Sequence, residues 1–138
     1  MITLVIDASV ATSYLLKSQR TVATVSLFEA WGRYTAFAPY VFLLEMPWVL
    51  LKQERRSQER GLAQTALRRL SDLDIEIDDP LDAADLHSTL MMASRQGLGF
   101  YDAMYVMLAV QTGATLATRD GPQANVARML GVEVLDVR

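Results

Sequence analysis

The stretch "GLGFYDAMYVMLAVQTGATLATRD", residues 97–120, places a single carboxylate among aromatic and aliphatic side chains. Asp102 has such residues on both sides, and burial of an unpaired charge there would cost several kcal/mol. The glycines at 97 and 99 predict the end of one helix, and residues 102–112 are expected to form the next. Asp102 is therefore either a helix cap near water or a residue that faces a positive group inside the protein.

Outward from this stretch, apolar patterning predicts strands that alternate with helices. Strands are expected at residues 2–6, 34–39, 74–78, 114–118 and 132–137, and helices at 8–17, 21–33, 40–56, 57–73, 80–97, 102–112 and 123–131. This alternation predicts the α/β class, as a three-layer α/β/α sandwich around a mostly parallel central sheet. Neither a repeat nor a linker rich in Pro, Gly or Ser interrupts the chain, so we expect a single domain over residues 1–138.

Two local features refine the helix predictions. Pro47 lies inside the segment 40–56, and we expect a bend just after Glu45 because proline lacks a backbone N–H and clashes with the preceding turn. Ser57 is expected to cap the helix predicted for residues 57–73.

Composition excludes several kinds of chemistry. The chain has no cysteine, which excludes disulfides, thiolate nucleophiles and iron–sulfur clusters, and His87 is its only imidazole. The net charge of −3 argues against nucleic-acid binding dominated by a basic surface, although a polyanion can still bind through a metal ion. Neither a signal peptide nor an apolar run of the roughly 20 residues that span a bilayer is visible, so we expect a soluble, cytoplasmic protein.

Four acidic residues stand out because they do not lie on ordinary polar helix faces. Asp7 and Asp120 follow predicted strands, whereas Glu45 and Asp102 lie in apolar helices. The carboxyl ends of parallel strands meet at one edge of a sheet, so these acids are expected to share a cleft. Like charges there would resist ionisation unless a cation neutralised them, and Mg²⁺ or Mn²⁺ prefers such oxygen ligands. Taken singly, Asp7 and Asp102 can also be N-caps, and Asp120 a turn residue.

Four motifs around these acids resemble the PIN domain, most closely the small ribonuclease toxins of the VapC type. They are "VIDASV" at residues 5–10, "APYVFLLE" at 38–45, "GFYDAMYVMLA" at 99–109 and "LATRD" at 116–120. The resemblance covers essentially the whole chain. It implies an endoribonuclease that depends on Mg²⁺ or Mn²⁺ and hydrolyses RNA phosphodiester bonds, acts as a toxin, forms a homodimer and is silenced by a cognate antitoxin.

The resemblance also implies roles for particular residues. The catalytic, metal-binding residues would be Asp7, Glu45, Asp102 and Asp120, with Ser9 and Thr118 in or beside the site. The expected RNA contacts are Arg55, Arg56, Arg60 and Arg119. For the first three, a solvated helix face paired with neighbouring glutamates is the alternative. Whether one metal ion binds or two stays open.

This chain departs from the resemblance in one turn, where Trp48 follows Pro47 at a position that is Asn in many relatives. We therefore expect no polar support for Glu45 from that turn. A PIN-like fold kept as a non-catalytic interaction module is the main alternative function. A phosphoacceptor receiver domain is a weaker one, because Asp7 stands alone and no lysine follows a late strand. A serine hydrolase is weaker still, because His87 is expected on a helix surface and no Gly-x-Ser-x-Gly motif is present.

Overall fold

A five-stranded, fully parallel sheet forms the centre of the protein, whose computed structural model describes residues 1–138. The strand order is β3-β2-β1-β4-β5. The strands are β1 (Ile2–Ile6), β2 (Tyr34–Ala38), β3 (Glu76–Ile77), β4 (Thr115–Thr118) and β5 (Val134–Asp136). In the register of the sheet, Leu4 of β1 lies opposite Ala36 of β2 and Thr115 of β4. The predicted α/β class is confirmed.

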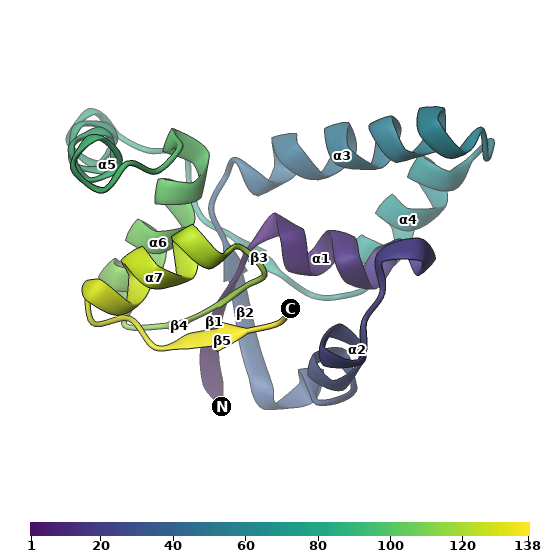
Figure 1. Ribbon diagram of the computed structural model, residues 1–138, viewed down its shortest axis with the longest axis horizontal. Helices are drawn as coiled ribbons and strands as arrows, with labels where there is room; N and C mark the ends of the chain where they lie inside the picture. The colour runs from purple at the N-terminus through teal and green to yellow at the C-terminus, as the bar shows by residue number, and fades with distance from the viewer.

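Helices cover both faces of this sheet and extend beyond one of its edges. The α-helices are α1 (Ala8–Leu15), α2 (Val22–Glu29), α3 (Phe42–Ser57), α4 (Leu62–Ser71), α5 (Ala83–Gln96), α6 (Phe100–Thr112) and α7 (Gly121–Met129), and two short 3₁₀ helices span Lys17–Gln19 and Trp31–Arg33. Figure 1 shows α6 and α7 on one side of the sheet and α1 and α2 on the other. Above them, α3 and α5 stand on opposite sides of the molecule.

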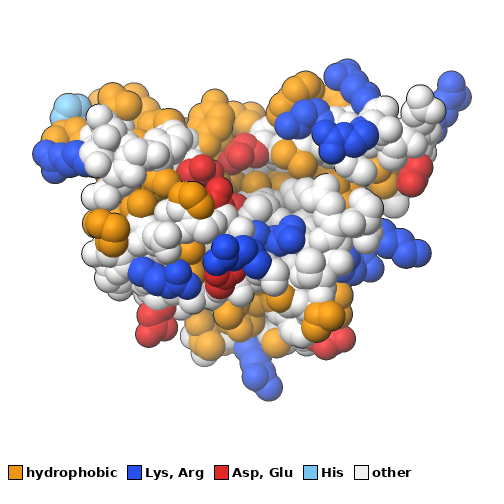
Figure 2. All heavy atoms as spheres, in the orientation of Figure 1, with side chains coloured by type: hydrophobic (Ala, Val, Ile, Leu, Met, Phe, Trp, Pro, Cys, Tyr) orange, Lys and Arg blue, Asp and Glu red, His pale blue; other side chains and the backbone are white.

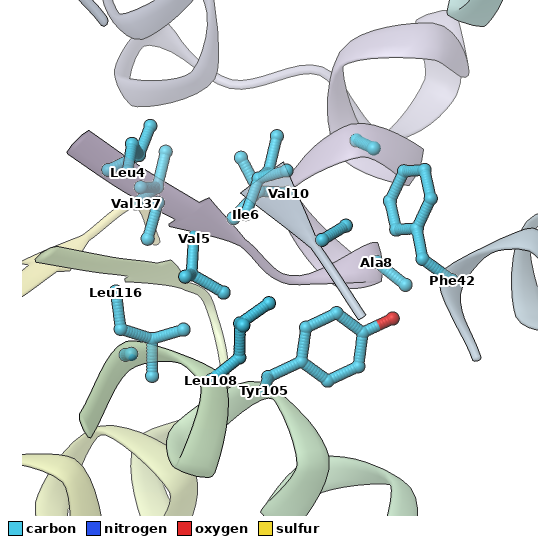
Figure 3. Close-up of a cluster of buried hydrophobic side chains, with 14 of the residues drawn as sticks. Leu4, Val5, Ile6, Ala8, Val10, Phe42, Tyr105, Leu108, Leu116 and Val137 are labelled. Atoms are coloured by element: carbon cyan, nitrogen blue, oxygen red, sulfur yellow. The ribbon is translucent and has the colours of Figure 1, made fainter. Parts of the chain in front are cut away.

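The core occupies both faces of the sheet. Leu4, Val5 and Ile6 of β1 are fully buried, as expected for a strand covered on two sides, because successive side chains point to opposite faces. Figure 3 shows how residues from distant segments meet them, including Tyr105 of α6. The ring of Tyr105 is completely inaccessible to solvent, and Phe42 at the start of α3 is nearly so.

Several local predictions differ from the structure. The helix α6 begins at Phe100 with Gly99 as its N-cap, so Asp102 is not a helix cap, and α2 ends at Glu29.

Ser57 does not cap the helix after it; it ends α3, and α4 begins only at Leu62. Gln58 and Gly61 adopt left-handed backbone conformations, with φ of 58° and 81°, and these turn the chain between the two helices. The strand expected at 74–78 pairs over only two residues, Glu76 and Ile77, at the edge of the sheet.

The helix α3 continues through Pro47 from Phe42 to Ser57. The structure contains no helix that combines the length and the apolar character needed to cross a bilayer.

Candidate metal centre

Asp7 and Asp120 follow neighbouring strands of the sheet, as the sequence predicts. Asp7 follows β1 and is the N-cap of α1, where its Oδ2 accepts a hydrogen bond of 3.0 Å from the backbone N–H of Ser9. Asp120 follows β4 and is the N-cap of α7, where its Oδ1 accepts a bond of 2.8 Å from the backbone N–H of Gln123. The sequence offers an N-cap as the alternative role of Asp7 and a turn as that of Asp120; in the structure both residues are N-caps and both also lie in the cluster. The caps fix the two carboxylates at adjacent strand ends.

Glu45 and Asp102 come from the first turns of two helices that reach the same edge. Glu45 lies in the first turn of α3 and Asp102 in the first turn of α6, where the helix dipole favours a negative charge. Both side chains are only partly buried. The hydroxyl of Tyr105 donates a 2.8 Å hydrogen bond to Oε1 of Glu45. Polar support for Glu45 therefore comes from α6 rather than from the turn that contains Trp48, whose side chain is exposed and lies beside Lys52.

The charges of the four acids act on one another. Burial raises the pKa of Asp102 to about 6, and the charges of Asp7 and Asp120 add to this effect. Burial also raises the pKa of Asp7, with a further contribution from Asp120. The pKa of Glu45 is raised by burial, and the charges of Asp7 and Asp102 contribute in the same direction. The structure thus brings all four predicted acids into one electrostatic cluster, and Figure 2 shows acidic side chains gathered near the middle of this face.

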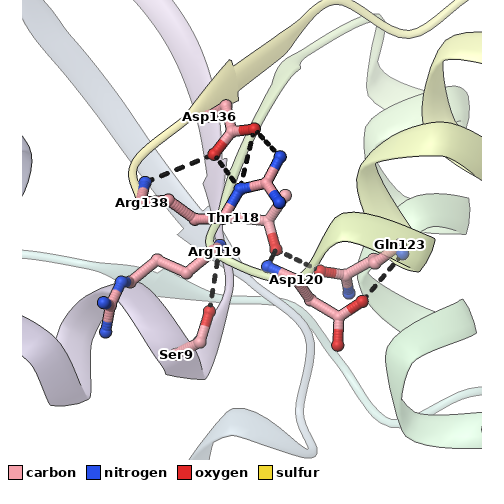
Figure 4. A network of polar contacts seen from close by, with 7 residues as sticks. All are labelled: Ser9, Thr118, Arg119, Asp120, Gln123, Asp136 and Arg138. Atoms are coloured by element: carbon pink, nitrogen blue, oxygen red, sulfur yellow. Dashed lines mark hydrogen bonds and ion pairs between the residues drawn. The ribbon is translucent and has the colours of Figure 1, made fainter.

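None of the four acids forms a salt bridge with a basic side chain. The only salt bridge in the structure joins Arg138 to Asp136 at the end of β5, and the charge of Arg138 also acts on Asp120 without forming an ion pair with it. Arg119 immediately precedes Asp120, but its side chain extends away from that carboxylate (Figure 4), and its buried Nε has no hydrogen-bond partner. Four acids that share an edge without a cation are a suitable set of ligands for a hard metal ion.

The cluster fits a hard cation in its chemistry, although it is not preassembled for one. Every donor is a carboxylate oxygen, the type of ligand that Mg²⁺ and Mn²⁺ select. In this conformation, however, no group of three or more acidic, histidine or cysteine side chains is arranged to hold a metal ion. Repulsion between carboxylates favours such a spread, and Glu45 and Asp102 are only partly buried. We therefore expect metal binding to draw the acids together.

Beside the cluster lies an open pocket of about 350 Å³. It is lined by Glu45, Gly99, Phe100, Tyr101 and Asp102. The ring of Tyr101 is 56% exposed and meets that of Phe100 edge to face. The pocket thus combines two of the acids with accessible aromatic surface, and it gives a ligand access to the cluster.

The other predicted site residues lie in different places. The hydroxyl of Ser9 accepts a bond of 3.3 Å from the N–H of Arg119, and that of Thr118 accepts one of 3.0 Å from the N–H of Asp120. Both hydroxyls therefore hold the turn after β4. By contrast, Arg56 lies eleven residues after Glu45, about 16 Å along α3. Figure 2 shows basic side chains over that distant end of α3, so the structure does not bring the arginines at 55, 56 and 60 to the cluster.

Two residues of the site, Tyr105 and Gln123, do not stand out in the sequence. Tyr105 fits the apolar pattern of its helix, and Gln123 lies in the last predicted helix without any local anomaly. The side chain of Gln123 is fully buried and contacts Asp7 and the backbone of Asp102. The spacing of Asp120 and Gln123 matches a helix capping box and so indicates a helix start, but it does not indicate the contact of Gln123 with Asp7.

The raised pKa values predict that the metal-free protein loses stability as pH rises. A carboxyl whose pKa is higher in the folded state binds more protons there than in the unfolded chain, so the free energy of unfolding falls across the interval between the two values. For Asp102 this interval runs from its ordinary value of 3.8 to about 6. In EDTA, the melting temperature should be higher at pH 5 than at pH 7, and Asp102→Asn should flatten this dependence. An identical profile for the variant would contradict the raised pKa.

Taken together, the fold and the site define a class: a parallel α/β domain that presents unneutralised carboxylates at the carboxyl edge of its sheet. The PIN domain family model matches residues 4–129, and the chain therefore belongs to the PIN domain family. PIN domains are generally metal-dependent nucleases. A search of the curated proteins found no match for this chain.

Solved structures share the fold over nearly the whole chain. PAE2754 from Pyrobaculum aerophilum has a TM-score of 0.74 at 20% identity, and the alignment covers 99% of this chain and 90% of that one. VapBC2 from Rickettsia felis, solved bound to a DNA fragment from its promoter, gives 0.71 at 16% identity, with 98% of each chain covered. FitAcB from Neisseria gonorrhoeae gives 0.63 at 18% identity, with 96% of each chain covered. At such low sequence identities, the structural similarity shows that these proteins share the fold of this chain.

Proposed function

We propose that this chain is a metal-dependent endoribonuclease and the toxin of a toxin–antitoxin pair. The observation that carries the proposal is the set of four carboxylates, which affect one another's charge at the carboxyl edge of a PIN-domain sheet and form no salt bridge. The similarity in fold to VapBC2 and FitAcB supports the toxin role.

In this proposal, Asp7, Glu45, Asp102 and Asp120 hold Mg²⁺ or Mn²⁺. The bound ion would activate water and stabilise negative charge on a phosphodiester. The chain's own contribution is to fix the ligands. The backbone N–H groups of Ser9 and Gln123 hold Asp7 and Asp120, and the hydroxyl of Tyr105 orients Glu45. Because Tyr105 is fully buried, the ring keeps this bond away from competing water.

RNA would approach the cluster from the face shown in Figure 2. Arg119, beside Asp120 and without a carboxylate partner, is a candidate contact for a phosphate next to the reacting one. The exposed arginines at the end of α3 and in the following turn are candidates for phosphates farther along the strand. They serve positioning rather than the reaction, because they lie far from the acids along α3.

Reversal of Arg55, Arg56 and Arg60 to Glu should weaken RNA binding and flatten its dependence on salt. Each phosphate contact that is lost should lower the slope of log K against log salt concentration by about 0.7 for single-stranded RNA. Binding can be measured by fluorescence anisotropy at several salt concentrations, in metal-free buffer. The control reverses Lys17, Arg33 and Arg95, which are also exposed and give the same change in net charge. Equal slopes for the two triple variants would mean that Arg55, Arg56 and Arg60 do not contact RNA and only form a solvated surface.

We propose two protein partners, an antitoxin and a second copy of the chain. An antitoxin that presents an arginine to the cluster would supply the cation that the acids lack, because a guanidinium can bind carboxylate oxygens in pairs. Support for a homodimer comes from apolar side chains left exposed on the two projecting helices, Leu44 and Trp48 on α3 and Leu86 and Leu90 on α5.

A non-catalytic interaction module is the alternative function, and a metal titration distinguishes the two. An interaction module has no need for four carboxylates that raise one another's pKa and are left without a counter-charge. Isothermal titration of the purified protein with Mn²⁺ should show saturable binding that Asp102→Asn weakens strongly. Absence of saturable binding by the wild-type protein would favour the interaction module.

A further inference from the structure

Gln123 occupies the centre of the candidate metal site without being one of its acids. Its side chain has no exposed surface, although glutamine is usually a surface residue. Its Nε2 donates to Oδ1 of Asp7 at 3.3 Å and to the backbone carbonyl of Asp102 at 3.0 Å. Its backbone N–H donates to Asp120. One buried residue therefore touches three of the four acids.

The hydrogen bonds around Gln123 form a series in which each donor and each acceptor is fixed. The N–H of Asp120 donates to the hydroxyl of Thr118, and this hydroxyl donates in turn to Oε1 of Gln123 at 2.5 Å. Figure 4 shows these contacts between Thr118, Asp120 and Gln123. With Oε1 held as an acceptor, the amide nitrogen can only face Asp7 and the carbonyl of Asp102. Both of its N–H groups are then used, so the orientation of the amide is fully determined.

From this geometry we propose that Gln123 is a positioning residue of the metal centre, which sets the orientation of Asp7 and ties α6 to the turn after β4. The inference rests on the proposed function. A glutamine suits this role because it is neutral: it donates to Asp7 without cancelling the negative charge that a metal ion requires. Each carboxylate oxygen of Asp7 accepts one hydrogen bond and keeps a second lone pair for a ligand.

The test compares Gln123→Met with the wild-type protein. Methionine matches glutamine in length and lacks donors, and Asn125→Met, at an exposed position of the same helix, is the control. Mn²⁺ affinity is measured by electron paramagnetic resonance of the free ion, well below the melting temperature of each metal-free protein. We expect Gln123→Met to raise the Mn²⁺ dissociation constant by about 10- to 100-fold, which is the usual effect of losing a residue that hydrogen-bonds to a metal ligand. The control should bind as the wild type does.

A second pair of variants keeps the inference testable if Gln123→Met does not fold. Thr118→Val removes the hydroxyl that orients the amide and should also weaken Mn²⁺ binding. Thr118→Ser keeps the hydroxyl and should bind Mn²⁺ as the wild type does. RNA cleavage gives a further readout, because excess Mn²⁺ should recover the activity of a variant whose only defect is metal affinity.

The outcomes separate this inference from the function on which it rests. If the wild type binds Mn²⁺ and the folded Gln123 and Thr118 variants bind it equally well, Gln123 supports only the fold and the inference is wrong. If the wild type binds no Mn²⁺, both the inference and the proposed metal-dependent function are overturned.

Discussion

Expression of this chain alone in bacteria should arrest growth, and Asp7→Asn or Asp102→Asn should abolish the arrest. Each variant keeps the shape of the side chain but removes a charge that a hard metal ion requires. Loss of an outer-shell partner alone typically lowers metal affinity or activity 10- to 100-fold, so we expect loss of a ligand to reduce RNA cleavage by more than about 100-fold. Asn is as good an N-cap as Asp, so Asp7→Asn should keep the bond from Ser9, but its amide nitrogen then faces Nε2 of Gln123 and that hydrogen bond is lost. Asp102→Asn has no such conflict, and the folding of both variants is checked by circular dichroism.

Growth and total RNA integrity are compared at matched protein levels. Asp82→Asn is the matched control, because Asp82 is an exposed N-cap of α5 that accepts a hydrogen bond from the backbone N–H of Asp85 and lies outside the acidic cluster. It should remain as toxic as the wild type. Equal toxicity of all four proteins would indicate an action that does not depend on the acids.

Saturating Mn²⁺ should raise the melting temperature of the wild-type protein by about 10 °C. A ligand that binds only the folded state adds about 2.7 kcal/mol at one hundred times its dissociation constant. One kcal/mol corresponds to roughly 3–5 °C for a domain of this size. Asp102→Asn should remove this shift and should itself melt higher than the wild type in EDTA, because it relieves repulsion among the acids.

Differential scanning fluorimetry at pH 7 measures both effects. Asp82→Asn should respond to Mn²⁺ as the wild type does. An unchanged melting temperature of the wild type at saturating Mn²⁺ would count against a metal site. An equal shift in Asp102→Asn would mean that the ion binds elsewhere on the protein.

The fold could be predicted wherever a buried element leaves a periodic pattern. The run from Ile2 to Ile6 predicts a covered strand because its β-branched and aliphatic residues suit both faces of a parallel sheet. The start of α4 could not be predicted, because the serine at position 57 gives a valid cap signal and the left-handed turn at Gln58 depends on how α3 and α4 pack. The strand at 74–78 was overestimated because the extent of an edge strand depends on its neighbour.

The acids of the site could be predicted, but the residues that hold them could not. Asp7 and Asp120 follow strand patterns, and Glu45 and Asp102 are charged residues in apolar helices, so each is anomalous in its local sequence. Gln123 is not anomalous, since a glutamine three residues after an aspartate is typical of a helix start. Its contact with Asp7 joins residues 116 positions apart, and only the assembled sheet reveals it. Tyr105 was missed because its ring fits the apolar pattern while its hydroxyl reaches Glu45.

Cleavage of RNA by the purified protein tests the central claim most directly. A single-stranded RNA labelled at one end is incubated with the wild type in Mn²⁺, in EDTA, and in EDTA followed by excess Mn²⁺, beside Asp102→Asn prepared identically. The proposed function predicts discrete internal cleavage in Mn²⁺, none in EDTA, recovery when Mn²⁺ is restored, and none by the variant. Cleavage that persists in EDTA or in Asp102→Asn, or intact RNA in every reaction of the wild type, would contradict it.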